Sequence, residues 1–305
     1  MGFEHKSVLL FETVDGLNIK PDGIYVDGTL GGGGHAYEVA SRLGENGSII
    51  GIDQDAAAIK AAGERLKDFG EKVTIVRSNY CEMKSRLQEL GIDKVDGIVL
   101  DLGVSSYQLD TAERGFTYRE DAPLDMRMNR RGGMTAADVV NGYDADTLAQ
   151  VLKMYGELDT TWKIANCIER ARKISEIRTT GELVAAVAPC TPKKEEAKFL
   201  TKLFQALRIE VNGEMEALKM ALEQSLKVLR PGGRLVVISY HSLEDRLVKN
   251  FFKSGNFDGK VEKDFYGHIS SPFEVVTRKA VVPTDEELVR NSRSRSAKLR
   301  AAIKL

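Results

Sequence analysis

The stretch Val26-Asp27-Gly28-Thr29-Leu30-Gly31-Gly32-Gly33-Gly34-His35 decides the fold of this chain. A short β-branched run precedes it and a segment with apolar residues at helical spacing follows it, which predicts a turn between a strand and a helix. Four consecutive glycines remove the side chains from this turn and permit a positive φ. Because an ordinary tight turn needs only one or two glycines, the run predicts a backbone surface that lies against a ligand.

Outward from this turn, the first hundred residues alternate short apolar runs with helical segments. Such alternation predicts right-handed crossovers and a parallel sheet that is covered by helices on both faces. The predicted strands are 24–27, 48–53, 73–77 and 95–102, and the predicted helices are 35–43, 55–69 and 82–90.

A long helical segment then interrupts this alternation. The next predicted strand is 234–239, which follows a predicted helix at 214–229 and the turn Arg230-Pro231-Gly232-Gly233. We therefore expect a sheet domain made of residues 1–114 and 213–305, with a helical subdomain inserted at 115–212. The insert shows helical periodicity at 145–155, 162–174, 180–188 and 195–207, and the sheet domain continues with a helix at 243–252 and a β-rich stretch at 273–282 that could pair antiparallel at the sheet edge.

The bulk composition is that of an ordinary soluble globular protein. Of the 305 residues, 42% are hydrophobic and 29% are charged, and the formal net charge is -1. This net charge gives no global attraction to nucleic acid, so any such binding must come from local patches. Residues 290–305 hold six basic and no acidic residues, which fits either a nucleic-acid contact or a solvated, frayed terminus.

Cysteine usage and hydropathy indicate a cytoplasmic protein. Cys81, Cys167 and Cys190 are odd in number and widely spaced without a C-x-x-C pair, which argues against a disulfide framework and against a zinc site. No apolar run approaches the roughly 18 to 20 residues that span a bilayer, and the start MGFEHKSVLL lacks the apolar core of a signal peptide. We expect no membrane association, no export and no metal.

Three carboxylates follow predicted strands of the sheet. Asp27, Asp53 and Asp101 end the first, second and fourth strands, and ligands of doubly wound sheets bind outside these carboxyl ends. The three side chains are therefore expected to converge on one crevice. The loop also fits the loose G-x-G-x-x-A pattern at 31–36, and an NAD enzyme would likewise place an acidic residue at Asp53, so a dinucleotide remains an alternative at this point.

The frame D-G-T-x-G-x-G around Asp27 resembles the first motif of class I methyltransferases, which implies S-adenosylmethionine as the cofactor. Tyr80, after the third strand, supplies an aromatic ring that could cover the adenine. Longer motifs resemble the RsmH (MraW) family of bacterial ribosomal RNA methyltransferases, and they extend from HKSVLL at residue 5 to the basic tail. They are DGTLGGGGH, DLGVSSYQLD, GFTYREDAPLDMRM, FQALRIEVN, LRPGGRLVVISYHSLEDRLVK and NSRSRSAKLR.

The family resemblance implies an α/β fold of the class I methyltransferase type: a Rossmann-like, doubly wound, mostly parallel sheet with an inserted helical subdomain for substrate recognition. It also implies methyl transfer from S-adenosylmethionine to the N4 amine of a cytidine in small-subunit (16S) ribosomal RNA, free or in the 30S subunit. The implied cofactor contacts are Gly33, Gly34, His35, Asp53, Tyr80, Asp101 and Gln108.

The chemistry of an aromatic amine sets requirements on the catalytic side chains. The N4 lone pair of cytosine is delocalised into the ring, so transfer needs in-line placement and oxygen acceptors near the amine. Asp101 and Ser105 could supply these acceptors, and Tyr240 and His241 could face the target base, although packing at the strand end explains the last two equally well. Amino-methylating DNA enzymes carry a D/N/S-P-P-Y/F motif after the fourth strand, but here residues 101–107 read DLGVSSY, with Tyr107 free to stack on the base.

Basic side chains are expected to line the approach of an unpaired or flipped cytidine. Arg127 and Arg208 are the favoured RNA contacts because they lie inside the family motifs. The segment 198–203, KFLTKL, departs from the family's H-P-A-[TK]-R pattern, although Lys202 keeps a positive charge. Two alternatives stay open: methylation of a DNA amine or small molecule, and RNA binding without turnover. The remaining candidate contacts are Arg114, Arg119, Arg130, Arg131, Lys193, Lys194, Arg293 and Arg295.

Overall fold

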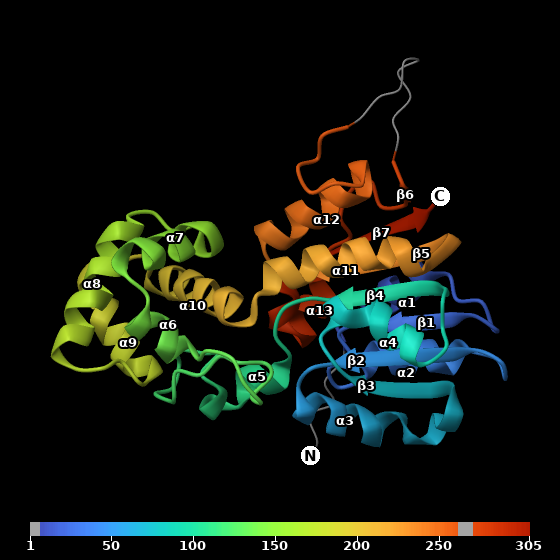
Figure 1. Ribbon diagram of the computed structural model, residues 1–305, viewed down its shortest axis with the longest axis horizontal. Helices are drawn as coiled ribbons and strands as arrows, with labels where there is room; N and C mark the ends of the chain where they lie inside the picture. The colour runs from blue at the N-terminus through green and yellow to red at the C-terminus, as the bar shows by residue number, and fades with distance from the viewer. Residues whose placement is uncertain (1–6, 262–270) are drawn as a thin grey trace. The chain divides into compact units, whose positions relative to one another are not determined.

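The computed structural model describes residues 7–261 and 271–305, so the first two residues of the HKSVLL motif lie outside it. The chain forms two compact units, whose residues can be followed by colour in Figure 1. Unit 1 comprises Met1–Gly103 and Met215–Leu305, and unit 2 comprises Val104–Glu214. Unit 2 thus begins at Val104, earlier in the chain than the predicted boundary at residue 115.

The described part of unit 1 contains a sheet of seven strands in the order β3-β2-β1-β4-β5-β7-β6. Neighbouring strands from β3 to β5 are parallel, whereas β7 is antiparallel to both β5 and β6. This confirms the mostly parallel α/β sheet. The strands are β1 (Ile24–Asp27), β2 (Ser48–Asp53), β3 (Val73–Arg77), β4 (Val95–Asp101), β5 (Leu229–Ser239), β6 (Phe273–Val275) and β7 (Lys298–Lys304).

The basic tail belongs to the sheet rather than to a frayed end. Residues 298–304 form β7, in which Lys298 pairs with Ser239 of β5. Leu299 and Ala301 of this strand are buried. Of the β-rich stretch predicted at 273–282, only Phe273–Val275 forms a strand, β6, and it pairs antiparallel with β7 as expected.

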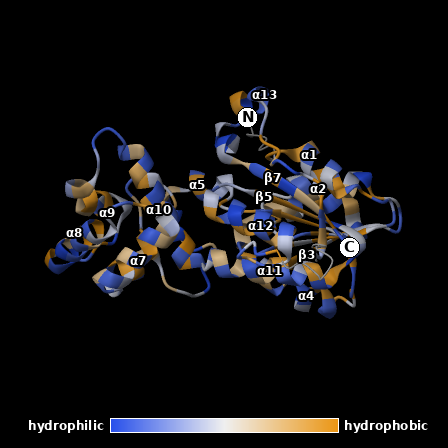
Figure 2. Cartoon of the chain, turned by 90° about the horizontal axis from the view of Figure 1, so that it is seen from above, coloured by the Kyte–Doolittle hydropathy of each residue, from blue (hydrophilic) through white to orange (hydrophobic). Residues whose placement is uncertain are grey.

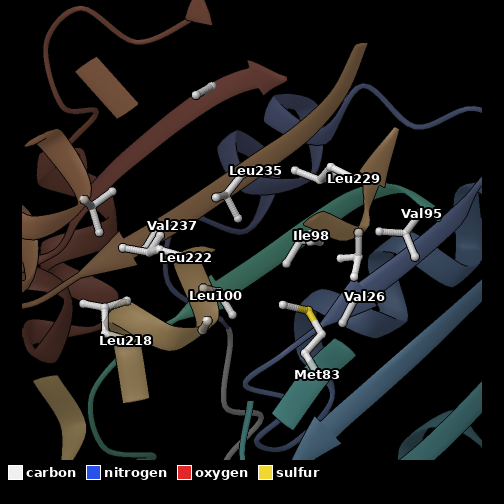
Figure 3. Packing of buried hydrophobic residues seen from close by; sticks show 14 of the residues in the cluster. Val26, Met83, Val95, Ile98, Leu100, Leu218, Leu222, Leu229, Leu235 and Val237 are labelled. Carbon is white, nitrogen blue, oxygen red and sulfur yellow. The ribbon is translucent and has the colours of Figure 1, made fainter. Parts of the chain in front are cut away.

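Alternate strand residues build two hydrophobic cores on the two faces of the sheet. On β4, Ile98 and Leu100 face the core with α4, α11 and α12, whereas Val99 faces the core with α1, α2 and α3. Figure 3 shows the first core, where Met83 and Leu222 meet side chains of the central strands. The helices are α1 (Leu10–Leu17), α2 (Gly34–Arg42), α3 (Ala56–Leu66), α4 (Met83–Glu89), α11 (Glu214–Val228), α12 (Ser242–Ser254) and α13 (Asp285–Arg290).

Residues 230–233, which were predicted as a turn, lie within β5, where they interrupt its pairing with β4. Val95 pairs with Leu229 and Gly97 with Arg234, so the pairing of β4 with β5 shifts between these positions. The four intervening residues of β5 have no partners on β4 in this register. The helix before them ends at Val228, within one residue of the prediction.

Unit 2 packs its helices around a hydrophobic core of its own. Leu148, Leu152, Ile164, Leu203 and Leu207 are all buried in this core. The four helices predicted here are confirmed, and α6 is an additional short helix that begins with a capping box. The helices are α5 (Ser106–Asp110), α6 (Ala136–Gly142), α7 (Ala145–Gly156), α8 (Thr161–Ile174), α9 (Thr180–Val187) and α10 (Glu196–Asn212).

One expectation from the cysteines is wrong. Cys167 of α8 and Cys190, which follows α9, form a disulfide within unit 2, and Cys81 is free. Odd number and wide spacing could not exclude this pair, because the helical packing brings together two residues that lie 23 positions apart.

In Figure 2 the central strands of unit 1 are mostly orange, whereas the helices carry both blue and orange residues. Within residues 7–261 and 271–305, no helix is long and apolar enough to cross a membrane.

Candidate active site

The glycine-rich turn joins β1 to α2, as predicted, and Asp27 lies at its start. Asp27 is 1% exposed, and its Oδ1 accepts a hydrogen bond of 3.1 Å from the Thr29 amide. Burial raises the pKa of this carboxyl to about 6, although the nearby His35 acts in the opposite direction. Asp27 therefore organises the turn from inside the protein.

The glycines of the turn form a cradle of bare backbone. Gly33 has φ +76° and is the N-cap of α2, and a Cβ atom at this position would lie 3.1 Å from Leu66. At Gly34 a Cβ atom would overlap Ser7, whereas at Gly32 it would meet no atom within 4 Å. The turn is thus closed on the protein side and open at Gly32, which suits a ligand lying directly on the backbone.

Asp53 ends β2 and holds the same turn from the neighbouring strand. Its Oδ2 accepts from the Gly31 amide at 2.8 Å and its Oδ1 from the Asp55 amide at 2.8 Å. Burial raises the pKa of Asp53. Each carboxylate oxygen has a second lone pair, so Asp53 can still accept hydrogen bonds from ribose hydroxyls.

Asp101 ends β4 and connects three elements of the site. Its amide donates to Thr29 Oγ1 at 2.6 Å, and its Oδ1 accepts from the Tyr240 hydroxyl at 2.8 Å. Burial raises the pKa of Asp101 to about 7; the hydrogen bond from Tyr240 lowers this pKa, and the charge of Glu244 raises it. Asp101 is therefore a carboxyl group that changes its protonation state near neutral pH.

His35 is a buried member of the site rather than a surface residue. It is 5% exposed, and its Nε2 lies 3.0 Å from the carbonyl oxygen of Val8. Since a carbonyl only accepts, Nε2 carries the proton, and Nδ1 then faces Asp101 Oδ2 at 3.8 Å. Burial lowers the pKa of His35, which favours the neutral ring.

Tyr240 and His241 connect β5 to α12. The burial of Tyr240, together with the adjacent Asp101, raises its pKa well above 10. His241 is the N-cap of α12, where its Nδ1 accepts from the Glu244 amide at 3.4 Å. Sequence reasoning missed Glu244, although the spacing His241-x-x-Glu244 is that of a capping box.

Tyr80 lies beside the glycine turn. It opens a short 3-10 helix, Tyr80–Glu82, and a Cβ atom on Gly28 would lie 3.4 Å from the Tyr80 Cβ. The preceding Asn79 caps this turn and donates to Gln54 Oε1 at 3.1 Å. The third strand thus delivers an aromatic ring to the edge that holds Asp27, Asp53 and Asp101.

Ser105 and Gln108 belong to unit 2, where they form the capping box of α5. The Ser105 amide donates to Gln108 Oε1 at 3.1 Å, and the Gln108 amide donates to Ser105 Oγ at 3.3 Å. Gln108 is 5% exposed, whereas Tyr107, between them, is 55% exposed. The Ser105 hydroxyl, predicted as an acceptor for the substrate amine, therefore already accepts a backbone amide.

The two favoured RNA contacts are bound to carboxylates inside unit 2. Arg127 Nε lies 2.7 Å from Asp125 Oδ1, and Arg208 forms a bidentate pair with Glu214 at 2.8 and 3.0 Å. Arg114 is also buried and donates to the Arg127 carbonyl. These guanidinium groups stabilise unit 2 through ion pairs and hydrogen bonds. Membership in a family motif could not distinguish this structural role from a contact with RNA. The candidates with exposed side chains are Arg119, Arg130, Arg131, Lys193, Lys194, Arg293 and Arg295.

The segment that departs from the family pattern also has a structural explanation. Lys202 of α10 donates to the carbonyl of Glu157, the C-cap of α7, at 2.9 Å. A cation at a helix C-terminus compensates for carbonyls that lack partners within the helix. The positive charge retained at residue 202 therefore serves helix packing in unit 2.

Comparison with known proteins identifies the family of this chain. Residues 2–305 match the model of the MraW methylase family. The chain is 54% identical over 99% of its length, and 97% of the relative's, to the ribosomal RNA small subunit methyltransferase H of Parabacteroides distasonis. It is 52% identical, over 98% and 97% of the two chains, to the protein of that name in Bacteroides thetaiotaomicron. A chain with this sheet, this glycine cradle and these matches belongs to the MraW methylase family.

Proposed function

We propose that this methyltransferase transfers the methyl group of S-adenosylmethionine to the N4 amine of a cytidine in small-subunit ribosomal RNA. The relatives described above carry the name of a small-subunit ribosomal RNA methyltransferase. The observation that carries the proposal for this chain is Asp101, a carboxylate beside the glycine cradle that is anchored by Tyr240 and can accept from an amine.

The residues around the cradle fit S-adenosylmethionine. The bare backbone at Gly32 and Gly33 suits the methionine part, Asp53 retains acceptor capacity for the ribose hydroxyls, and the Tyr80 ring suits the adenine. Gly34, His35, Asp101 and Gln108 complete the proposed cofactor contacts. When bound, the cofactor supplies an electrophilic methyl group on a positively charged sulfur.

Asp101 would act as the acceptor for the substrate amine. A hydrogen bond from N4 to a fixed carboxylate holds the amine in line and favours the pyramidal geometry that transfer needs. Because the pKa of Asp101 is about 7, the carboxylate is ionised in mildly alkaline solution and can also accept the proton that the methylated amine releases. The Tyr240 hydroxyl would fix the rotamer of Asp101.

His241 and Ser105 receive supporting roles in this proposal. Both are N-caps, of α12 and α5 respectively, and each uses its side-chain acceptor for a backbone amide of its own helix. A cap fixes the direction in which a helix leaves a strand or loop. We therefore assign His241 to the shape of the site at the end of β5, and Ser105 to the start of α5 in unit 2, rather than either of them to contact with the reacting amine.

Exposed arginines are the proposed contacts to the RNA phosphates, in free ribosomal RNA or in the 30S subunit of the cytoplasm. Arg293 and Arg295 lie in the 3-10 helix Ser292–Ser296, just before β7. Since Lys298 pairs with Ser239, this helix lies at the edge of the sheet where β5 ends and Tyr240 follows. In unit 2, Arg130 and Arg131 offer further exposed guanidinium groups.

The test is methyl transfer to small subunits purified from a strain that lacks this enzyme. After incubation with methyl-labelled S-adenosylmethionine, nuclease digestion and mass spectrometry should reveal N4-methylcytidine. The Asp101→Asn variant should lose this product, whereas Asp93→Asn, which changes an exposed carboxylate before β4, should keep it. Label in another nucleoside, in DNA or in a metabolite would overturn the cytidine assignment, and cofactor binding without any label would support a protein that binds RNA without turnover.

A further inference from the structure

Glu244 is a buried carboxylate beside the site that the proposed reaction does not yet use. It lies in the first turn of α12 and is only 3% exposed. Burying a carboxylate is costly, and this one acts electrostatically on a second, partly buried carboxylate, Asp101. A helix cap at the protein surface would serve α12 without that cost.

The contacts of Glu244 fix the two residues that follow β5. Its Oε2 accepts from the Tyr240 amide at 2.8 Å, and its Oε1 lies 3.1 Å from His241 Nε2. His241 Nδ1 accepts from the Glu244 amide, whereas Nε2 forms no hydrogen bond with the Glu244 carboxylate despite its proximity. The Glu244 carboxylate thus holds the backbone at the end of β5 through the Tyr240 amide, and the Glu244 amide holds the His241 ring.

This arrangement continues to the proposed acceptor. The residue whose amide Glu244 holds, Tyr240, donates its hydroxyl to Asp101 Oδ1 at 2.8 Å. The Tyr240 ring also lies near Gly103, where a Cβ atom would be 3.4 Å from its Cδ2. A shift of the Tyr240 backbone would therefore change the direction of the hydrogen bond to Asp101.

We propose that Glu244 is a positioning residue for methyl transfer, which holds Tyr240 by its amide so that the tyrosine hydroxyl fixes Asp101 against the substrate amine. This inference rests on the proposed function only for the identity of the amine. Glu244 does not touch the reacting atoms; it acts through Tyr240.

The charge of Glu244 gives the proposal a signature that a purely structural cap lacks. The groups that face Asp101 are Asp27 of β1, His35 of α2, Tyr240 after β5 and Glu244 of α12. Glu287 of α13 acts on Tyr240 and His35 in turn. The charge of Glu244 raises the pKa of Asp101, and the Tyr240 hydrogen bond lowers it. Removing the charge of Glu244 should therefore lower the pKa of Asp101, and removing the Tyr240 hydroxyl should raise it.

The experiment measures the single-turnover rate of methyl transfer at saturating cofactor and subunit across the pH range. Transfer needs ionised Asp101, so the rate falls on the acid side. In Glu244→Gln, which keeps the shape and one oxygen acceptor, this acid limb should move to lower pH. In Tyr240→Phe it should move to higher pH, and the rate at alkaline pH should fall on the order of 10²-fold because the acceptor is no longer held. Glu223→Gln, at an exposed position of α11, should match the wild type.

Three results would overturn the proposal: an unchanged acid limb in Glu244→Gln, a uniform rate loss at every pH, or shifts in the same direction for both variants. If Glu244→Gln does not fold, Glu244→Asp keeps the charge but shortens the side chain; it should lose rate while binding cofactor normally, and a wild-type rate would refute the positioning role. Carbon-13 NMR of the aspartate carboxyls in the enzyme without RNA tests the Asp101 shift independently. It decides the inference even if wild-type enzyme methylates no cytidine, which would refute only the proposed function.

Discussion

Replacing Asp101 by asparagine should make the protein more stable in alkaline solution while removing its activity. The reason is that the folded state holds this carboxyl in a place where its charge is disfavoured, and its pKa is about 7 instead of 3.8. Asparagine has nearly the same shape and keeps an oxygen for the Tyr240 hydroxyl, but it carries no charge.

The sign and size of the effect follow from linkage. A carboxyl with a raised folded-state pKa favours the folded state below pH 3.8, and this contribution is lost as the pH rises through about 7. Each unit of pKa difference between the folded and unfolded states corresponds to 1.36 kcal/mol. Near pH 8.5, ionised Asp101 therefore lowers the free energy of unfolding of the wild type by about 4 kcal/mol. At about pH 5 the folded carboxyl is protonated, and the cost falls below about 2 kcal/mol.

The assay is urea unfolding of wild type and Asp101→Asn at about pH 5 and about pH 8.5. The variant should be the more stable protein at both, by a margin that grows by about 2–3 kcal/mol between the two conditions. A margin that does not change with pH would show that Asp101 is not held in a charge-disfavouring site, and the proposed acceptor role would lose its physical basis. Asp93→Asn is the control and should show no such dependence.

Three further substitutions test other parts of the structure. Gly33→Ala should lower the free energy of unfolding by about 1–2 kcal/mol, because its left-handed φ disfavours a side chain, and calorimetry should show weaker binding of S-adenosylmethionine; wild-type affinity would contradict the cradle. Arg127→Met should destabilise the protein to urea by about 2–4 kcal/mol, because it leaves the largely buried Asp125 carboxylate with only the longer ion pair to Arg130, and Asp125→Asn in the same background should recover part of that loss. Leu222→Ala should lower the free energy of unfolding by about 2–5 kcal/mol, because it leaves a cavity in the core of unit 1. Thermal unfolding measures this loss, and a smaller loss would indicate that the core collapses around the cavity.

The strand ends that carry the site were predictable because local patterns define them. Asp27, Asp53 and Asp101 each end a β-branched run, and parallel topology brings such ends to one edge without any knowledge of side-chain contacts. The glycine run likewise predicts its conformation, since glycine adopts the left-handed φ found at Gly33 without steric cost.

The features that escaped prediction depend on partners from elsewhere in the chain. Residues 298–304 read as a basic tail, and only pairing with β5 makes them a strand. The motif arginines Arg127 and Arg208 read as RNA contacts until their carboxylate partners are known. Glu244 was not among the predicted site residues, because its burial is a property of the packed structure.

The interruption of the sheet by unit 2 has a consequence for how the protein folds. β4 and β5 are hydrogen-bonded neighbours, yet the whole of unit 2 lies between them in the chain. Pairing them requires closing a long loop, and the entropy of closure grows only slowly with loop length, by about 0.6 kcal/mol for each doubling. Since unit 2 has its own core, it can form by local contacts on a fast timescale while the central pairing of the sheet waits for a slow search. We expect two kinetic phases in refolding, with cofactor binding acquired only in the second.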